Sequence, residues 1–217
     1  MGIAWIDNTH QLLTIHAMLI FYGNAANQSL SGMVAADVEN YWNGPKAVLN
    51  LRNGLYPVQF SIKGGYAAGL TETDVYENVN PRNNYFRVEE FATGNISFVD
   101  DINCNTGYFK LDNLLNNSST AAHEFGHTIG LRHPEILDIR GHGTPGIMYP
   151  RGTIVDPKYQ YDPAAAPLQP GGTMDPSKRK VLLNDIANLR LPALNFNTAG
   201  LAVLGAFSSV WHDAHQP

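Results

Sequence analysis

The sequence has only one cysteine among its 217 residues, Cys104, and this scarcity excludes several kinds of site. A single thiol cannot form a disulfide within the chain and has no second thiol for a Cys-x-x-Cys metal knuckle. Charged residues are also scarce, at 15% of the chain, and 14 Lys and Arg stand against 19 Asp and Glu. The longest basic run is 178–180, so the sequence does not offer the basic surface that nucleic acids require.

Long apolar runs are missing as well. The longest uncharged apolar stretch, 199–211, is interrupted by Gly205, Ser208 and Ser209 and is too short to cross a bilayer, so we expect no membrane span. Residues 1–7 lack the basic region and apolar core of an export signal, which indicates either a cytoplasmic start or a missing upstream segment. The 44% of hydrophobic residues suffice for one folded domain, 1–217.

Hydrophobic periodicity predicts a sheet and a helix in the first half of the chain. Residues 30–42 have apolar side chains at helical spacing, and Asn27 or Ser29 can cap that helix. Residues 64–93 show no sustained period. The alternating segments that we expect to be strands are 12–21, 47–52, 55–63, 95–99 and 108–111, the second and third joined by a hairpin turn at Asn53-Gly54.

A second helix is expected from the cap candidates Ser118–Thr120 to Gly130. The remainder is rich in Pro and Gly and is predicted to be mostly loop, with one more helix that begins at Asp175-Pro176. Val181, Leu182, Ile186 and Leu189 would form the buried side of that helix.

The helix after residue 118 contains a metal-binding pattern. His123 and His127 are four residues apart, so both imidazoles project from one helical face and can hold one ion. Glu124 lies beside the first ligand, where a carboxylate can hydrogen-bond a metal-bound water and act as a general base. Gly130 permits a left-handed turn that brings His133 back as a third ligand. Three nitrogen ligands leave one open position, which is typical of catalytic zinc.

A Gly- and Pro-rich turn follows at 142–150 and contains Met148. The order HExxHxxGxxH and then a methionine turn resembles the metzincin metallopeptidases, and Met-Tyr-Pro is most similar to their matrixin branch, the matrix metalloproteinase-like enzymes. The resemblance covers residues 118–150. It implies an α+β fold with a twisted, mostly parallel five-stranded sheet and two helices in an upper subdomain (about 1–132). A loop-rich lower subdomain (about 133–217) would end in a C-terminal helix, and Met148 would form an apolar floor beneath the zinc.

The sequence also departs from the matrixin pattern. Matrixins continue with Pro-x-Tyr, but this chain has Pro150-Arg151-Gly152. The substrate preference of matrixins therefore does not carry over to a pocket formed here by Tyr149, Pro150 and Arg151. The cysteine-switch motif is absent. No histidine occurs between His16 and His123, so we expect one zinc and not the additional structural zinc of matrixins.

The sequence contains other candidate metal ligands. Residues 152–159 resemble the GTxxDxxY motif of aspzincins, although Gln160 replaces the next glycine, so Asp156 is an alternative third ligand. His142, His212 and His215 are expected not to bind the zinc. Calcium could bind near the acidic residues Asp100, Asp101 and Asp112, although such loop carboxylates are usually solvated.

These patterns predict a zinc-dependent endopeptidase in which Glu124 activates a water for attack on a polypeptide substrate. The substrate would lie extended against the strand at 95–99. A non-catalytic, zinc-stabilised binding or toxin domain is the alternative, and a toxin would need a protein inhibitor or immunity protein in its producer. We expect a secreted protein, or one delivered outside the producing cell as part of a larger or processed chain.

Overall fold

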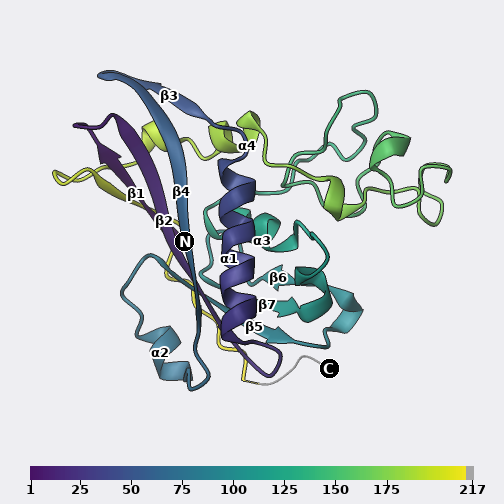
Figure 1. The fold of residues 1–217 in the computed structure, drawn as a ribbon, viewed down its shortest axis with the longest axis horizontal. Helices are drawn as coiled ribbons and strands as arrows, with labels where there is room; N and C mark the ends of the chain where they lie inside the picture. Colours follow the sequence, from purple (N-terminus) through teal and green to yellow (C-terminus); the bar gives the residue numbers. More distant parts are fainter. Residues whose placement is uncertain (214–217) are drawn as a thin grey trace.

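A computed structural model describes residues 1–213 as a mixed α/β fold built around one sheet (Figure 1). The strands in this range are β1 (Gly2–Asp7), β2 (Leu12–Tyr22), β3 (Val48–Leu51), β4 (Gly54–Tyr66), β5 (Asn83–Glu89), β6 (Phe98–Val99), β7 (Thr106–Lys110) and β8 (Leu201–Leu204). The α-helices are α1 (Gln28–Asn43), α2 (Glu72–Tyr76), α3 (Thr120–Thr128) and α4 (Leu183–Asn188).

The sheet combines a parallel centre with antiparallel margins. Its main path runs β3-β4-β2-β5-β7-β6, in which β4, β2, β5 and β7 are parallel and β6 is antiparallel to β7. The first half of β2 also pairs with β1, which in turn pairs with β8. The described sheet therefore has eight strands where five were expected, because β1, β3 and β8 extend it beyond the path β4-β2-β5-β7-β6.

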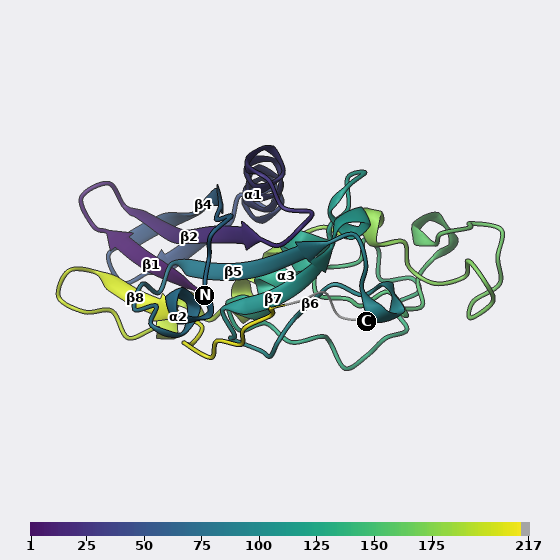
Figure 2. The same cartoon turned by 90° about the horizontal axis from the view of Figure 1, so that it is seen from below.

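The largest core lies between the sheet and helices α1 and α3. Alternate residues of β2, from Leu13 to Phe21, are at most 3% exposed, which confirms the alternation predicted for this strand. Phe21, Phe86 and Phe109 bring rings from β2, β5 and β7 into contact on the helix side. Figure 2 shows α1 on this side of the sheet and α2 on the other.

The local signals near α1 and the hairpin are confirmed. The Asn27 side chain accepts a hydrogen bond from the N–H of Leu30 at 2.9 Å, which caps the helix. β3 and β4 form the predicted antiparallel pair, and Gly54 has a φ of 136°, a left-handed conformation that favours glycine.

Three strands were not predicted, and one was predicted too long. β5 lies inside the segment without a sustained period, and β1 and β8 pair residues from opposite ends of the chain. The strand expected at 95–99 was wrong in extent, because 93–95 form a 3₁₀ turn with Gly94 at a φ of 66°. Only Phe98 and Val99 belong to β6.

The helix expected from Asp175-Pro176 was also wrong in extent. Pro176–Lys178 form a single 3₁₀ turn, and α4 begins only at Leu183. The break arises because Lys180 donates a backbone hydrogen bond to Pro145 and forms a bridge with Gly146, which requires extended backbone there. Val181, Ile186 and Leu189 are nevertheless buried as expected, whereas Leu182 is half-buried.

Residues 134–182 form loops and short 3₁₀ turns that extend away from the sheet in Figure 1, in agreement with the predicted loop-rich segment. Within 1–213, no helix has both the length and the apolar composition needed to cross a membrane. Nothing in the fold tests the division at residue 132, which stays a prediction.

Candidate metal centre

Helix α3 supplies two of the three candidate ligands. His123 and His127 lie one turn apart on the same face, and the whole helix from Thr120 to Thr128 is buried. Gly130 ends the helix with a φ of 102°, and the N–H of Leu131 donates to the carbonyl of Gly126 at 2.9 Å. This turn reverses the chain, as the sequence predicted, so that His133 comes back to the helix.

The three histidines converge through their Nε2 atoms. The Nε2 of His123 lies 3.2 Å from that of His127 and 3.0 Å from that of His133, and the remaining pair is 3.1 Å apart. Among residues 1–213, these three form the one group of His, Cys, Asp or Glu side chains close enough to hold a metal ion.

The hydrogen bonds around the rings determine which nitrogens face the centre. Nδ1 of His123 lies 2.7 Å from the carbonyl of Ile147 and 3.0 Å from Nη1 of Arg179; the carbonyl can only accept, and this shorter contact favours a proton on Nδ1. The Nδ1–H of His127 donates to the carbonyl of Leu131 at 2.7 Å. Both Nε2 atoms then carry lone pairs that point at the third ring. Converging lone pairs repel one another unless a cation or proton lies between them, so this donor set fits a metal ion.

Burial favours the neutral imidazoles that a metal requires. Loss of solvent lowers the pKa of His123 well below its ordinary value and lowers the pKa of His127 to about 4. The pKa of His133 is lowered for the same reason, although this residue is exposed. At neutral pH the three rings are therefore neutral and able to bind a metal.

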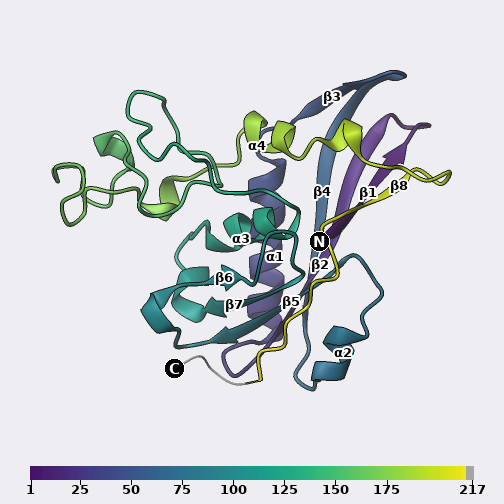
Figure 3. The same cartoon turned by 180° about the vertical axis from the view of Figure 1, so that it is seen from behind.

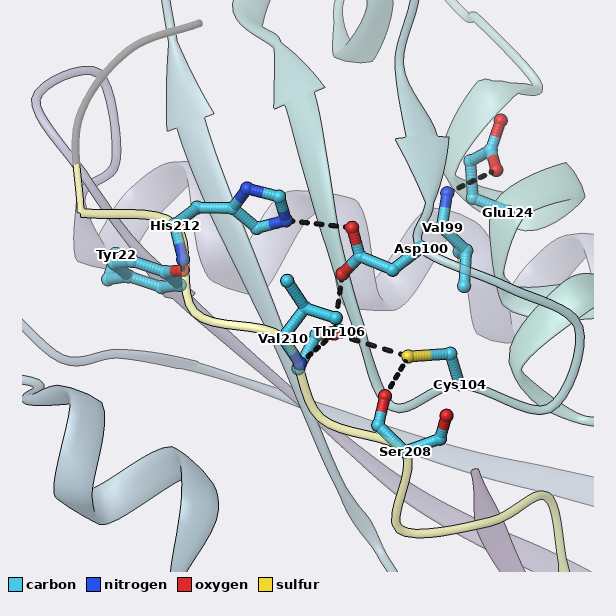
Figure 4. Close-up of polar contacts among 9 residues, drawn as sticks. All are labelled: Tyr22, Val99, Asp100, Cys104, Thr106, Glu124, Ser208, Val210 and His212. Atoms are coloured by element: carbon cyan, nitrogen blue, oxygen red, sulfur yellow. Dashed lines mark hydrogen bonds and ion pairs between the residues drawn. The ribbon is translucent and has the colours of Figure 1, made fainter.

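Glu124 lies beside the first ligand and is 6% exposed. Its Oε2 accepts a hydrogen bond from the N–H of Val99 in β6 at 3.1 Å (Figure 4). Burial raises the pKa of Glu124 to about 8, while Arg179 and the N–H of Val99 act in the opposite direction. Without a cation, the carboxyl is thus largely protonated at neutral pH, and a positive charge on the histidines would favour its ionised form.

Met148 lies against α3 at Gly126. A β-carbon at Gly126 would overlap Sδ of Met148, so the absence of a side chain at Gly126 lets the methionine pack closely beneath the helix. Met148 is 3% exposed and belongs to the main core. The role of Met148 as an apolar floor beneath a zinc ion stays a prediction. The close approach makes Gly126 a residue of the site that sequence reasoning missed.

Arg179 is a second missed residue. It belongs to the basic run 178–180, for which the sequence pattern indicated no role at the site, and Arg179 is only 3% exposed. Its guanidinium donates to Oγ of Ser119 at 2.9 Å and to the carbonyl of Tyr149 at 2.8 Å, which links the start of α3 to the methionine turn. Ser119 occupies the N-cap position, but its hydroxyl donates to the carbonyl of Pro176 and does not cap α3.

A cleft of about 570 Å³ opens over the histidines and Glu124. Its opposite wall is β6 and the residues around it, including Ser97, Phe98 and Val99. This cleft gives an extended ligand access to both the histidine triangle and the carboxylate.

The predicted pocket residues make contacts outside the lining of this cleft. Tyr149 packs against the apolar cluster of Ile139, Val155 and Met174, while Arg151 is exposed and donates to Oδ1 of Asn113 at 3.0 Å. Neither they nor Pro150 are among the residues that line the cleft, so their role in a specificity pocket stays a prediction.

The other candidate ligands make different contacts. Oδ1 of Asp156 accepts the N–H of Gly141 at 2.9 Å, and Asp156 is not part of the histidine group. Asp100 pairs with His212, whereas Asp112 pairs with Lys110 at 2.9 Å. Among the described residues, these aspartates form no cluster that could hold calcium. His142 is exposed, and His215 lies outside the described residues.

Comparison with known proteins adds no assignment, since no protein-family model and no curated protein matches the chain.

Proposed function

We propose that this protein is a zinc-dependent endopeptidase of metzincin-like fold. The observation that carries the proposal is the triangle of Nε2 atoms, 3.0 to 3.2 Å apart, with the buried carboxylate of Glu124 beside it in an open cleft. Three imidazoles with no fourth protein ligand among residues 1–213 are a donor set typical of catalytic zinc. Bound zinc would supply a Lewis acid and lower the pKa of a coordinated water.

The chain's own residues perform the proton transfers in this proposal. Glu124 accepts a proton from the attacking water and delivers it to the amine that leaves. The N–H of Val99 holds the Glu124 carboxylate in place, and burial keeps it away from bulk water. Such general acid–base catalysis typically contributes a rate factor of about 10² to 10⁴.

The sheet supports the comparison with metzincins. The path β4-β2-β5-β7-β6 contains five strands, of which only β6 is antiparallel to its neighbour, and it agrees with the mostly parallel five-stranded sheet that the resemblance implies. Met148 beneath α3 and the left-handed Gly130 support it further. These features favour a metzincin-like site, with the matrixin branch as the closest resemblance in sequence.

Polypeptide is the substrate class that the cleft fits best. Among residues 1–213, β7 is the one strand that pairs with β6, and β6 lines the cleft, so an extended peptide can add to it as a further strand. Phe98 and Ile96 add apolar surface to that wall for the peptide's side chains.

The test is cleavage of an unfolded protein such as casein by the zinc-loaded protein and by Glu124→Gln. The variant should fold and bind zinc with three unchanged histidines, yet lose at least about 100-fold in rate, because it lacks the general base. Glu90→Gln is the matched control, since Glu90 is exposed and remote from the motif. Cleavage by Glu124→Gln at the wild-type rate would refute the mechanism.

A chelator separates the enzyme from the non-catalytic alternative. Loss of cleavage with little unfolding supports the enzyme, whereas cooperative unfolding of a protein that cleaves nothing when zinc-loaded supports a structural zinc.

A further inference from the structure

The segment that follows β8, residues 206–213, packs on the face of the sheet away from α1, and we call it the C-terminal strap. Figures 2 and 3 show it leaving β8 and passing along β5 and β7. It begins where the N–H of Ala206 donates to the carbonyl of Asn103 at 2.8 Å. Near its end, the ring of Trp211 stacks on Tyr22 with centroids 4.9 Å apart, and Arg87 donates to the carbonyl of His212 at 3.0 Å.

His212 connects the strap to the residue that follows β6. Its Nε2–H donates to Oδ1 of Asp100 at 2.8 Å, and both side chains are at least nine-tenths buried, at 6% and 9% exposure (Figure 4). Oδ2 of Asp100 accepts the hydroxyl of Thr106 at 2.5 Å, and Oγ1 of Thr106 accepts the N–H of Val210 at 3.0 Å. Asp100 is thus held from two sides, by β7 and by the strap.

The contacts of the strap also reach the cleft wall. The ring of His212 meets the rings of Phe98 and Tyr108 edge-on, with centroids 5.9 Å away in each case. Phe98 itself stacks on Tyr108 and lines the cleft. His212 therefore supports Phe98 from behind and pairs with Asp100.

Val99 lies between these two supported residues and donates its N–H to Glu124 at 3.1 Å. Within 1–213, this is the one hydrogen bond that the carboxylate of Glu124 accepts. β6 is only two residues long, so few ladder hydrogen bonds hold it against β7. The N–H of Asp100 adds one more bond to β7, at the carbonyl of Thr106 (3.1 Å), so a side-chain brace beside Val99 would add to the few contacts that hold its N–H in one position.

We propose that Asp100 and His212 are positioning residues, whose buried pair braces β6 so that the N–H of Val99 holds the carboxylate of Glu124 at the histidine centre. A buried polar pair loses its hydration on folding and is a costly way to gain stability alone, whereas its directional hydrogen bonds are well suited to maintaining one geometry. The effect on the geometry of β6 is independent of any activity, whereas the effect on rate rests on the proposed endopeptidase function.

Two substitutions separate the hydrogen bond from ring packing. His212→Phe keeps a ring against Phe98 but removes the donor to Asp100, whereas His212→Gln keeps a donor and removes the ring. Ser209→Ala is the matched control, because it removes a strap hydrogen bond to Asn105 (2.9 Å) that does not reach β6.

The first measurement is hydrogen exchange of the Val99 amide in the metal-free and zinc-loaded proteins. We expect His212→Phe to speed this exchange about tenfold or more relative to core amides such as that of Phe86, and His212→Gln and Ser209→Ala to leave it within about threefold of wild type. Unchanged exchange in His212→Phe, or faster exchange in His212→Gln than in His212→Phe, would overturn the brace. If His212→Phe does not fold, Thr106→Val takes its place, because it removes the hydrogen bond from Thr106 to Asp100. Faster Val99 exchange in Thr106→Val would then support the brace, and unchanged exchange would overturn it.

The second measurement is peptide cleavage at equal zinc occupancy. We expect His212→Phe to lower kcat about tenfold or more and to change KM less than kcat, because only the position of the general base changes. His212→Gln should have most of the wild-type kcat. Zinc affinity should be unchanged in both. Faster Val99 exchange with an unchanged kcat would overturn the positioning role. If the wild-type protein cleaves nothing, the endopeptidase proposal fails, and the exchange result still decides whether the brace exists.

Discussion

The packing of Met148 beneath α3 can be tested by adding a single methyl group at Gly126. In Gly126→Ala, the new β-carbon would overlap Sδ of Met148 and lie 3.1 Å from its Cε and 3.2 Å from Cζ2 of Trp42. Met148 and Trp42 are both buried, at 3% and 1% exposure, so neither side chain can move aside into solvent. Gly32→Ala in α1 is the matched control, because nothing lies within 4 Å of a β-carbon there.

The expected magnitudes follow from two opposing contributions. Replacing a helical glycine by alanine stabilises the folded state by roughly 0.5–1 kcal/mol, and Gly32→Ala should show this gain in full. In Gly126→Ala, the same gain should be opposed by overpacking, which destabilises the folded state by about 1–3 kcal/mol. The free energies of unfolding of the two variants should therefore differ by about 1–3 kcal/mol, which is some 2–12 °C in Tm for a chain of this size.

Urea denaturation with a chelator present measures this difference without any contribution from bound metal. In a Met148→Ala background, the cost of Gly126→Ala should fall, because the sulfur that the new methyl group meets is gone. A stabilisation by Gly126→Ala equal to that by Gly32→Ala would show that Met148 does not pack against the helix, and the structural support for a methionine floor would be lost.

Two further predictions concern pH. Burial lowers the pKa of His127 to about 4 and also lowers those of His123 and His133, so the unfolded chain binds more protons below about pH 6.5. The metal-free protein should therefore lose stability as the pH falls from 6.5 towards 4, and urea midpoints that do not change over this interval would contradict the burial of neutral imidazoles. Glu124 has the opposite dependence. Its pKa is raised from the ordinary 4.5 to about 8 in the folded protein, so the folded state loses stability as the pH rises from 4.5 to 8. Metal-free Glu124→Gln should thus be more stable than wild type at pH 8 and differ little from it at pH 5; an equal difference at both pH values would refute the raised pKa.

Signals that depend on near neighbours in the chain were predicted well from the sequence. The helical spacing of His123 and His127 and the left-handed turn at Gly130 are local properties, and the structure places both as expected. The cap at Asn27 and the alternation in β2 were equally predictable, because each arises from a few adjacent residues.

Residues whose partners are distant in the chain were missed. β5 contains Arg87 and Glu89, and charged side chains argue against a central buried strand. They are buried because they pair with each other at 2.5 Å and because Arg87 also binds the carbonyl of His212, 125 positions away. Arg179 was missed for the same reason, since its partners Ser119 and Tyr149 are far from it in sequence.

The sequence by itself determined the spacing and order of the three histidines and the residue types available for chemistry, because a helix turn and a glycine turn place them within a short stretch of chain. Only the tertiary structure decided which polar side chains are buried, that β6 faces Glu124 and that the C-terminal strap supports β6. A buried charge is tolerated only where a partner compensates its lost hydration, and such partners are brought together by folding across the whole chain.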